Sequence, residues 1–326
     1  MNFEKYKLWL VAGLAGFFLA LSGCSTDRDP DSLYAPDAVG TLVIDAVLIV
    51  DQPLPSMRLS RTLAPNVPYT LEAAAEEGAM LVVTLGPEGL TTEVVYEATA
   101  TPGTYRPAGG APPVVLPGER YAVAVTTDAG EVLTAETTTP QRFAINQWVL
   151  LANDGSTELR ELKTFAELGN GVYYHPDNQL VYPEGLLDGR YGSDSAAAYE
   201  AAGFQLAIFS LDPDAGFVID PPFLEEEDFA ELARQGSSPA LDGEDGFVRL
   251  PWFSIFYDGR YLYKAFVVDS NWFDLIRTIP EGGGGLGFGG NVGEGVDPPL
   301  FHVNGGIGLF GSASVDSIGF FITPVP

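Results

Sequence analysis

The sequence predicts a mainly β protein: an immunoglobulin-like β-sandwich at residues 41–140, followed by a β-rich C-terminal domain at 141–326 with one or two short helices. Three observations predict this fold class. Apolar residues alternate with polar ones in short runs, as in half-buried strands. The 38 Gly and 25 Pro separate these runs at the spacing of turns. Hydrophobic residues make up 46% of the 326-residue chain, which is enough for a packed core.

The first segment, residues 1–23, has the features of a bacterial lipoprotein signal peptide. Two lysines precede an apolar run at 8–21, which has the length of a secretory signal and is shorter than the ~20 residues of a membrane span. The run ends in the lipobox Leu21-Ser22-Gly23-Cys24. We expect cleavage before Cys24, the only cysteine, and lipidation of that residue. Several acyl chains, palmitate among them, would then give a stable membrane anchor.

Residues 24–40 are expected to form an acidic, flexible tether, because polar residues and Pro30 dominate its start. An acidic stretch directly after the lipidated cysteine is similar to the surface-export signal of some Gram-negative lipoproteins. The sequence therefore favours a protein anchored in the outer membrane and exposed on the cell surface. A periplasmic orientation remains open.

The predicted sandwich consists of short strands with turn residues between them. The turn Asp128-Ala129-Gly130 joins the last two strands as a hairpin. The expected strands are 41–50, 57–62, 79–85, 91–98, 103–105, 121–125 and 131–137.

The C-terminal domain is less regular. Strands are expected at 148–152 and 204–210, and a helix at 223–234, where Gly236 follows as a cap. The strongest hairpin signal joins 252–257 to 260–268 through Asp258-Gly259. A short helix at 271–279, a glycine-rich loop at 282–295 and final strands at 301–310 and 315–322 complete the prediction.

Composition excludes several classes of protein. A net charge of −28 argues against nucleic acid as a partner, because no cationic surface displaces counterions. One Cys and two His argue against a disulfide scaffold and a multi-ligand metal centre. Only 4 of the 16 basic residues are Lys, a balance typical of proteins that work in high salt, where salt screens an acidic surface.

No catalytic, metal-binding or cofactor-binding residue can be assigned. The G-x-G-x-x-G at 285–290 lies among further glycines and prolines that prevent the helix a nucleotide site needs. The acidic residues at 242–245 are the best of the poor Ca²⁺ candidates, without EF-hand spacing. His175 and His302 lie in unrelated contexts, and no nucleophile turn accompanies them. A glycosidase pair of carboxylates stays open, because the chain offers many candidates and no means of choosing between them.

Aromatic residues supply the candidate ligand-binding surface. One group lies in a loop-rich stretch and is expected to be exposed, and a second lies in the aromatic-rich region 252–273, where core packing is the competing interpretation. The candidates are Tyr173, Tyr174, Tyr182, Tyr191, Trp252, Tyr257 and Trp272.

Four stretches together resemble the domain-of-unknown-function family 4249, which consists of outer-membrane lipoproteins of Bacteroidota-type bacteria. They are the lipobox, the strand pair at 42–62, the "G-x-Y … G-x-x-Y … G" run at 103–130 and the glycine motif at 298–311. The resemblance implies no activity and no catalytic residue. It does imply association with TonB-dependent β-barrel receptors.

The glycine motif also has a physical interpretation. Gly305, Gly306, Gly308 and Gly311 alternate with bulky apolar residues, and glycine in a strand permits close approach of another backbone. We expect this segment to dock tightly inside the C-terminal domain, so that valine at 306 or 308 would lower stability by more than ~1 kcal/mol.

These observations favour a non-enzymatic, lipid-anchored accessory protein of the outer membrane that binds a ligand or a partner barrel in nutrient uptake. Two alternatives stay open. One is a surface glycan hydrolase with two carboxylates, one of raised pKa, ~5–10 Å apart in a cleft. The other is a purely structural envelope lipoprotein, which would lack a concave aromatic site.

Overall fold

The computed structural model describes residues 39–86, 91–169, 175–181, 185–192, 196–218, 234–241, 246–250, 254–278 and 300–324. Within these ranges the protein is mainly β, as predicted, and its strands form one large sheet and a smaller four-stranded sheet. The glycine-rich loop at 282–295, the acidic cluster at 242–245 and all of the predicted helix at 223–234 except Arg234 lie outside the described residues.

The N-terminal strands match the predicted series closely. Alternate side chains of β1 and β6 are buried, which is the pattern that predicted them. They pair in the order β1-β2-β5-β4-β3-β6-β7. The elements are β1 (Leu42–Ile49), β2 (Met57–Arg61), the short helix α3 (Leu71–Ala74), β3 (Met80–Leu85), β4 (Thr92–Ala98), β5 (Thr104–Pro107), β6 (Arg120–Thr126) and β7 (Val132–Thr138).

The C-terminal half forms a second pair of packed sheets. The large sheet continues through β17, β15, β12 and β13, while the small sheet has the order β14-β11-β8-β9. Its elements are β8 (Gln147–Ala152), β9 (Glu158–Glu161), α4 (Phe165–Leu168), η3 (Pro176–Asn178), β10 (Gln179–Val181), β11 (Gly185–Arg190), η4 (Ala196–Tyr199), β12 (Gly203–Ser210), β13 (Gln235–Ser237), β14 (Phe247–Leu250), β15 (Gly259–Val268), α6 (Ser270–Thr278), β16 (Val303–Asn304) and β17 (Ile307–Thr323).

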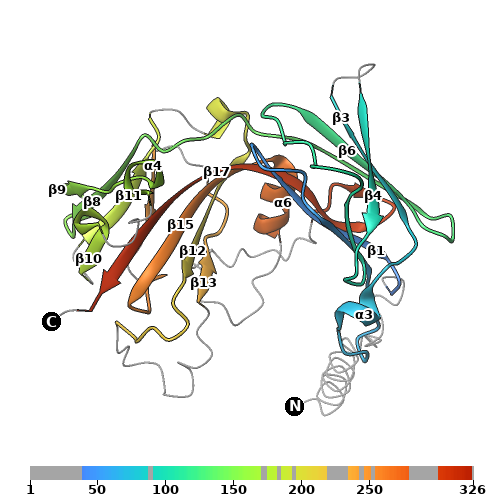
Figure 1. Cartoon of the computed structure of the whole chain (residues 1–326), viewed down its shortest axis with the longest axis horizontal. Coiled ribbons are helices and arrows are strands. Elements are labelled where there is room, and N and C mark those ends of the chain that lie inside the picture. Colours follow the sequence, from blue (N-terminus) through green and yellow to red (C-terminus); the bar gives the residue numbers. More distant parts are fainter. Residues whose placement is uncertain are drawn as a thin grey trace, which may run out of the picture.

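Strand β17 connects the two halves. Figure 1 shows it running along the arch of the molecule, from the C-terminal sheets to the N-terminal strands. Its first half pairs in parallel with β1, from Val43–Ile307 to Ile49–Ala313, and its second half pairs antiparallel with β15. The sequence predicted two strands here, at 301–310 and 315–322. The structure corrects this to the two-residue β16 and the single long strand β17.

The start of the C-terminal segment closes the N-terminal array. β16 pairs with β7, one edge of the array, and β17 pairs with β1, the other edge. Only Gly305 and Gly306 separate the two pairings. β17 thus covers β1 from Val43 to Ile49, and β16 pairs with Thr134 and Ala135 of β7, which reduces the open backbone edge that would invite aggregation.

Two hydrophobic cores result. The first is built by β1–β7 together with Phe310 from β17, and the second by residues from Phe143 to Ile322. In the second core Trp148 of β8 packs edge-on against Tyr263 of β15, with 5.6 Å between ring centroids. The chain passes from one core to the other between Ala135 and Phe143.

The predicted hairpin at 252–268 does not form in the part of it that the structure describes. Both edges of β15 are already occupied, by β12 and by β17. Residues 254–257 instead fold back locally, because the Tyr261 hydroxyl accepts a hydrogen bond from the Tyr257 backbone N–H and donates one to the Tyr257 carbonyl, each at 3.0 Å.

None of the helices in the described ranges has the length and apolar character of a membrane-spanning segment.

Candidate functional site

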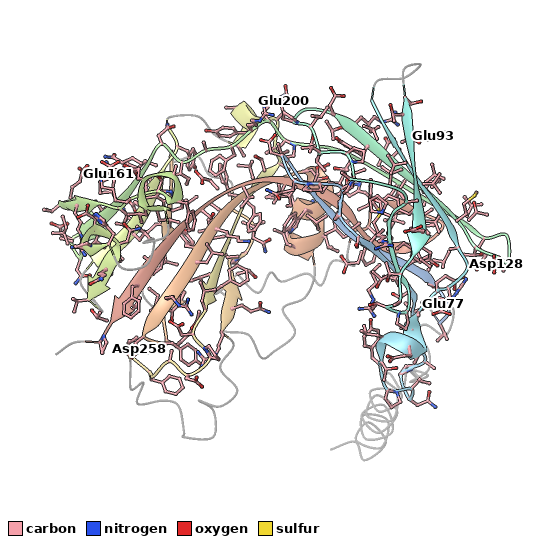
Figure 2. All side chains as sticks on the ribbon, in the orientation of Figure 1. Glu77, Glu93, Asp128, Glu161, Glu200 and Asp258 are labelled. Atoms are coloured by element: carbon pink, nitrogen blue, oxygen red, sulfur yellow. The ribbon has the colours of Figure 1, made fainter. Side chains whose placement is uncertain are left out.

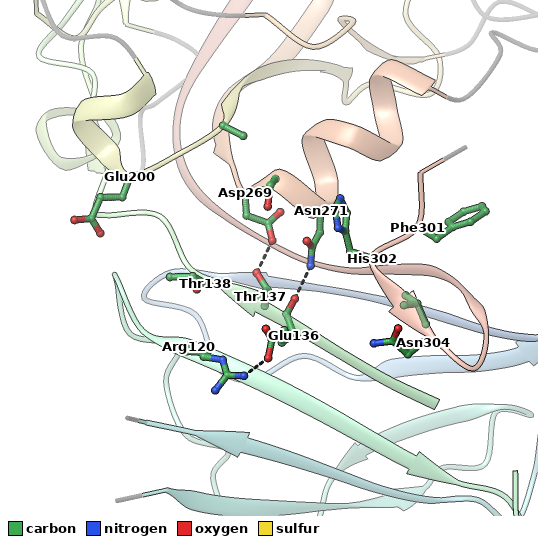
Figure 3. A pocket seen from close by; sticks show the side chains of 13 residues that line it. Arg120, Glu136, Thr137, Thr138, Glu200, Asp269, Asn271, Phe301, His302 and Asn304 are labelled. Carbon is green, nitrogen blue, oxygen red and sulfur yellow. Dashed lines mark hydrogen bonds and ion pairs between the residues drawn. The ribbon is translucent and has the colours of Figure 1, made fainter. Parts of the chain in front are cut away.

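A polar cleft lies where the two halves of the protein meet. Its volume is about 600 Å³. One wall comes from β6 and β7, and the other from the start of α6 and the residues that lead into β16 (Figure 3). The ionisable side chains that line it are Arg120, Glu136, Glu200, Asp269 and His302.

The floor of the cleft is a network of buried polar side chains. The Thr137 hydroxyl on β7 donates to the carboxylate of Asp269 and lies 2.7 Å from the Ser312 hydroxyl on β17. The Asn271 amide donates to the carbonyls of Glu136 (2.6 Å) and Phe310 (2.8 Å). Thr137, Asp269 and Ser312 are each at most 5% exposed. Buried polar groups are stable only when they are paired, so this network fixes β7, β17 and α6 relative to one another.

Asp269 also begins helix α6. Its Oδ1 accepts a hydrogen bond of 2.9 Å from the backbone N–H of Trp272, as an N-cap side chain does. Burial raises the pKa of the Asp269 carboxyl above its usual value, although the hydrogen bonds from Thr137 and Trp272 oppose the shift. Both carboxylate oxygens thus accept hydrogen bonds within the fold.

The raised pKa of Asp269 predicts that this residue lowers the free energy of unfolding as pH rises. A carboxyl whose pKa is higher in the folded state binds more protons there, so its contribution to stability falls as pH rises above the unfolded value of about 3.9. Asn at position 269 keeps a capping oxygen and never ionises. We therefore expect the stability of Asp269→Asn relative to wild type to increase between about pH 4 and about pH 7. Urea unfolding at several pH values measures this, and a difference that does not change with pH would contradict it.

The rim of the cleft carries charged side chains that are also paired. Arg120 and Glu136 form an ion pair across β6 and β7. Glu200 accepts a hydrogen bond of 2.9 Å from the Gln141 amide.

His302 stands on the opposite rim, with its Nε2 2.8 Å from Asp274 Oδ2. Arg277 donates to the other oxygen of Asp274 at 2.8 Å. Partial burial would raise the pKa of Asp274, but these two partners outweigh burial and lower it. His302 is therefore held beside a carboxylate that stays ionised.

Each ionisable side chain of the cleft already has a partner within the protein. Asp269 is the carboxyl with a raised pKa, and its oxygens are occupied by Thr137 and Trp272 rather than turned toward a substrate. Among the described residues no group of three or more His, Cys, Asp or Glu could hold a metal ion.

The structure places the predicted aromatic candidates differently from the expectation. Tyr191 was expected on an exposed surface, but it is 3% exposed and stacks on Phe204, with 4.9 Å between ring centroids. Tyr257 is 4% exposed and belongs to the same core. Trp272, on α6, is half-buried against Phe266. Cys24, Tyr173, Tyr174, Tyr182 and Trp252 lie outside the described residues.

The glycine motif docks tightly, but in a different place. It packs against the N-terminal sandwich, not inside the C-terminal domain, because β17 pairs with β1 at this point. A Cβ on Gly306 would lie 2.5 Å from Leu133 Cδ1 and 2.7 Å from the Leu42 carbonyl oxygen. A Cβ on Gly311 would lie 3.3 Å from both Asp269 Oδ1 and Trp272 Cβ, so the missing side chain lets α6 approach the strand.

The residues of the cleft floor were not predicted from the sequence. Asp269 lies two residues before the predicted helix at 271–279, and an Asp close to a helix start is a capping signal that could have identified it. Nothing local in the sequence shows that Thr137, Asp269 and Ser312 meet, because 132 and 175 positions separate Thr137 from its two partners.

Comparisons with known proteins give limited information. No curated protein matches the chain. Among solved structures, trypsin-activated α2-macroglobulin from Escherichia coli is 11% identical with a TM-score of 0.19, and the match covers 72% of this chain and 15% of that one. A 1.5-MDa bacterial ice-binding adhesin is 12% identical with a TM-score of 0.15, covering 87% of this chain and 64% of the other.

A family model gives the informative match. It is described as Domain of unknown function (DUF4249) and matches residues 29–174. The matched part includes all seven strands of the N-terminal array and β8 and β9 of the second half. The C-terminal glycine motif lies outside it. The match supports the resemblance to the DUF4249 family over residues 29–174.

Proposed function

We propose that this protein is a lipid-anchored accessory protein of the outer membrane, exposed on the cell surface. It binds a ligand or a partner β-barrel, a TonB-dependent receptor, and assists nutrient uptake without being an enzyme. The lipobox at Cys24 supports the anchor. The match of residues 29–174 to the DUF4249 family model, together with the resemblance to Bacteroidota-type lipoproteins, supports the location in the outer membrane.

The observation that carries the binding role is the cleft between the two halves. It is large enough for a small polar ligand or for a loop of a partner protein. Its ionisable groups are engaged in hydrogen bonds and ion pairs that hold the fold together. A site built in this way offers shape and hydrogen bonds, whereas a hydrolase needs a proton donor and a base that face the substrate.

A crosslinked purification from the native host tests the proposal. The full-length protein with a C-terminal tag is crosslinked in intact cells, the outer membrane is solubilised, and co-purifying proteins are identified. We expect a β-barrel receptor in stoichiometric amount. The matched control is Cys24→Ser, which removes the thiol to be acylated. The Cys24→Ser protein should be absent from the outer membrane fraction, and the barrel should no longer co-purify with it.

Recovery of the wild-type lipoprotein alone would contradict the association with a barrel. Wild-type protein outside the outer membrane fraction would contradict the anchor itself.

A further inference from the structure

The described chain begins, at Val39, at one end of the N-terminal sandwich. We call this end the tether pole and define it as residues 39–40, 61–80 and 126–132. Arg61 holds it together: it donates to the Gly40 carbonyl (2.7 Å) and to Glu76 (2.5 Å), and it pairs with Glu131. Glu77 and Asp128 lie at this end, next to α3 (Figure 2).

Large apolar side chains are exposed on the tether pole. Tyr69 is 64% exposed, and it precedes α3 in a stretch, 65–73, in which every residue is exposed. Arg58 donates to the Tyr69 hydroxyl at 2.6 Å, so the ring is held in place with its apolar faces in solvent. The exposed apolar residues of the pole are Val39, Val67, Tyr69, Leu71, Met80 and Val132. Val67, Tyr69 and Leu71 lie together in the exposed stretch 65–73, and exposed apolar side chains grouped in this way mark an interaction surface.

The position of this surface in the chain indicates what it meets. Val39 lies 15 positions after Cys24, so a fully extended connection spans at most about 50 Å. If Cys24 is acylated, the tether pole is the end of the folded protein that is attached closest to the bilayer. Attachment raises the local concentration of lipid at the pole, so a contact too weak for free binding becomes significant.

The net charge of the tether pole indicates which lipid headgroups it can contact. The pole carries the cation Arg61, with Arg58 bound to Tyr69 beside it, but also Glu72, Glu76, Glu77, Asp128 and Glu131. This negative excess disfavours an anionic lipid surface. A tyrosine with an apolar ring and a hydrogen-bonded hydroxyl is suited to the boundary between headgroups and acyl chains.

We propose that the tether pole rests on a zwitterionic lipid surface, with Val67, Tyr69 and Leu71 at the headgroup boundary. The inference rests on the lipid anchor of the proposed function. The contact would orient the molecule with this end of the N-terminal sandwich on the bilayer and the C-terminal sheets away from it. Because it involves few side chains, it forms only in the tethered protein.

The test supplies the tether artificially and so does not depend on natural lipidation. A chain from residue 24 with Cys24→Ser and an N-terminal His tag is attached to phosphatidylcholine vesicles that contain a nickel-chelating lipid. The replacement removes the only cysteine, so one new cysteine can carry an environment-sensitive fluorophore. Ala73→Cys labels exposed helix α3, and Leu159→Cys labels exposed β9 in the other half.

We expect vesicle attachment to shift the emission of the label at 73 to shorter wavelength and to make it sensitive to a quencher carried on the lipids. The label at 159 should not respond. Serine at 67, 69 and 71 together should abolish the response at 73, and those exposed positions can change without loss of the fold. A label at 73 that ignores vesicles, while flotation shows the protein attached, overturns the contact. Loss of the anchor in cells would instead overturn the proposed function alone.

Discussion

Replacing Gly308 by alanine should lower the free energy of unfolding by about 3 kcal/mol, because one methyl group would meet two obstacles. Gly308 has a φ of +114°, a conformation that residues with a side chain rarely adopt. A Cβ at this position would also lie inside the van der Waals distance of the Ile44 carbonyl oxygen on β1. Backbone on both strands would have to move.

The loss is expected to reach beyond one residue because of where the strand lies. Gly308 is paired with Ile44, near the start of the contact that closes the N-terminal array. Weakening this contact exposes the edge of β1 and loosens Phe310, which is 1% exposed in the first core. Folding of the N-terminal sandwich thus depends on a strand that is more than 160 positions away in the sequence.

Gly109→Ala is the matched control for this substitution. Gly109 also has a positive φ, of +91°, but nothing lies within 4 Å of the position of its Cβ. Gly109→Ala therefore measures only the cost of placing a residue with a side chain at positive φ, about 1 kcal/mol. Urea denaturation followed by circular dichroism measures both variants. Equal losses would show that close approach to β1 adds nothing, and would contradict the role assigned to Gly308.

The sequence predicted the N-terminal strands well because each strand buries one face and exposes the other. Alternation of apolar and polar residues then appears directly in the sequence, as in β7, where every second side chain is buried. The break predicted between 310 and 315 was wrong for a clear reason. Gly311, Ser312 and Ser314 interrupt the apolar pattern, but they lie in a continuous strand where it crosses between the cores.

Small polar residues are needed at that crossing. The Ser312 hydroxyl meets Thr137, and the Ser314 hydroxyl accepts a hydrogen bond of 2.9 Å from the Phe143 backbone. Both serines are at most 4% exposed. A hydrophobicity pattern assigns such residues to a loop, because their partners come from distant parts of the chain. The cleft was missed for the same reason.

Tyr191 shows the corresponding limit for aromatic residues. Its neighbours in sequence are polar and glycine-rich, which is typical of an exposed loop. Its ring is covered by Phe143, Tyr199 and Phe204, which reach it only in the folded structure. Local composition therefore predicted an exposed loop, whereas Tyr191 directly follows strand β11 and is buried.

The second large effect is expected at a buried ion pair in the C-terminal half. Arg249 on β14 binds both carboxylate oxygens of Asp188 on β11, at 2.6 and 2.8 Å. The Asp188 side chain is 4% exposed, and its charge raises the pKa of Arg249. Arg249→Ala should cost about 3 kcal/mol, because it leaves a carboxylate in the interior without its cation.

Arg106→Ala is the control for loss of an arginine as such. Arg106 pairs with Glu97 on the surface, where the two side chains are 63% and 48% exposed. Solvent screens such a pair, so the loss should be below about 1 kcal/mol. Urea unfolding of the two variants compares a buried with an exposed ion pair in one protein. Similar losses of unfolding free energy in the two variants would contradict a large contribution from the buried ion pair.

A second substitution separates two contributions to the stability loss of Arg249→Ala, the unpaired buried charge and the lost side-chain packing. Adding Asp188→Asn to Arg249→Ala removes the unpaired charge and keeps the shape of the side chain, so the double variant should be more stable than Arg249→Ala at neutral pH. Burial holds the pKa of nearby Tyr263 well above its usual value, and the charge of Asp188 raises it further. The Tyr263 hydroxyl has no hydrogen-bond partner among the described residues. If Asp188→Asn brings no recovery, the cost lies in the packing of the Arg249 side chain over Phe247 and not in the charge.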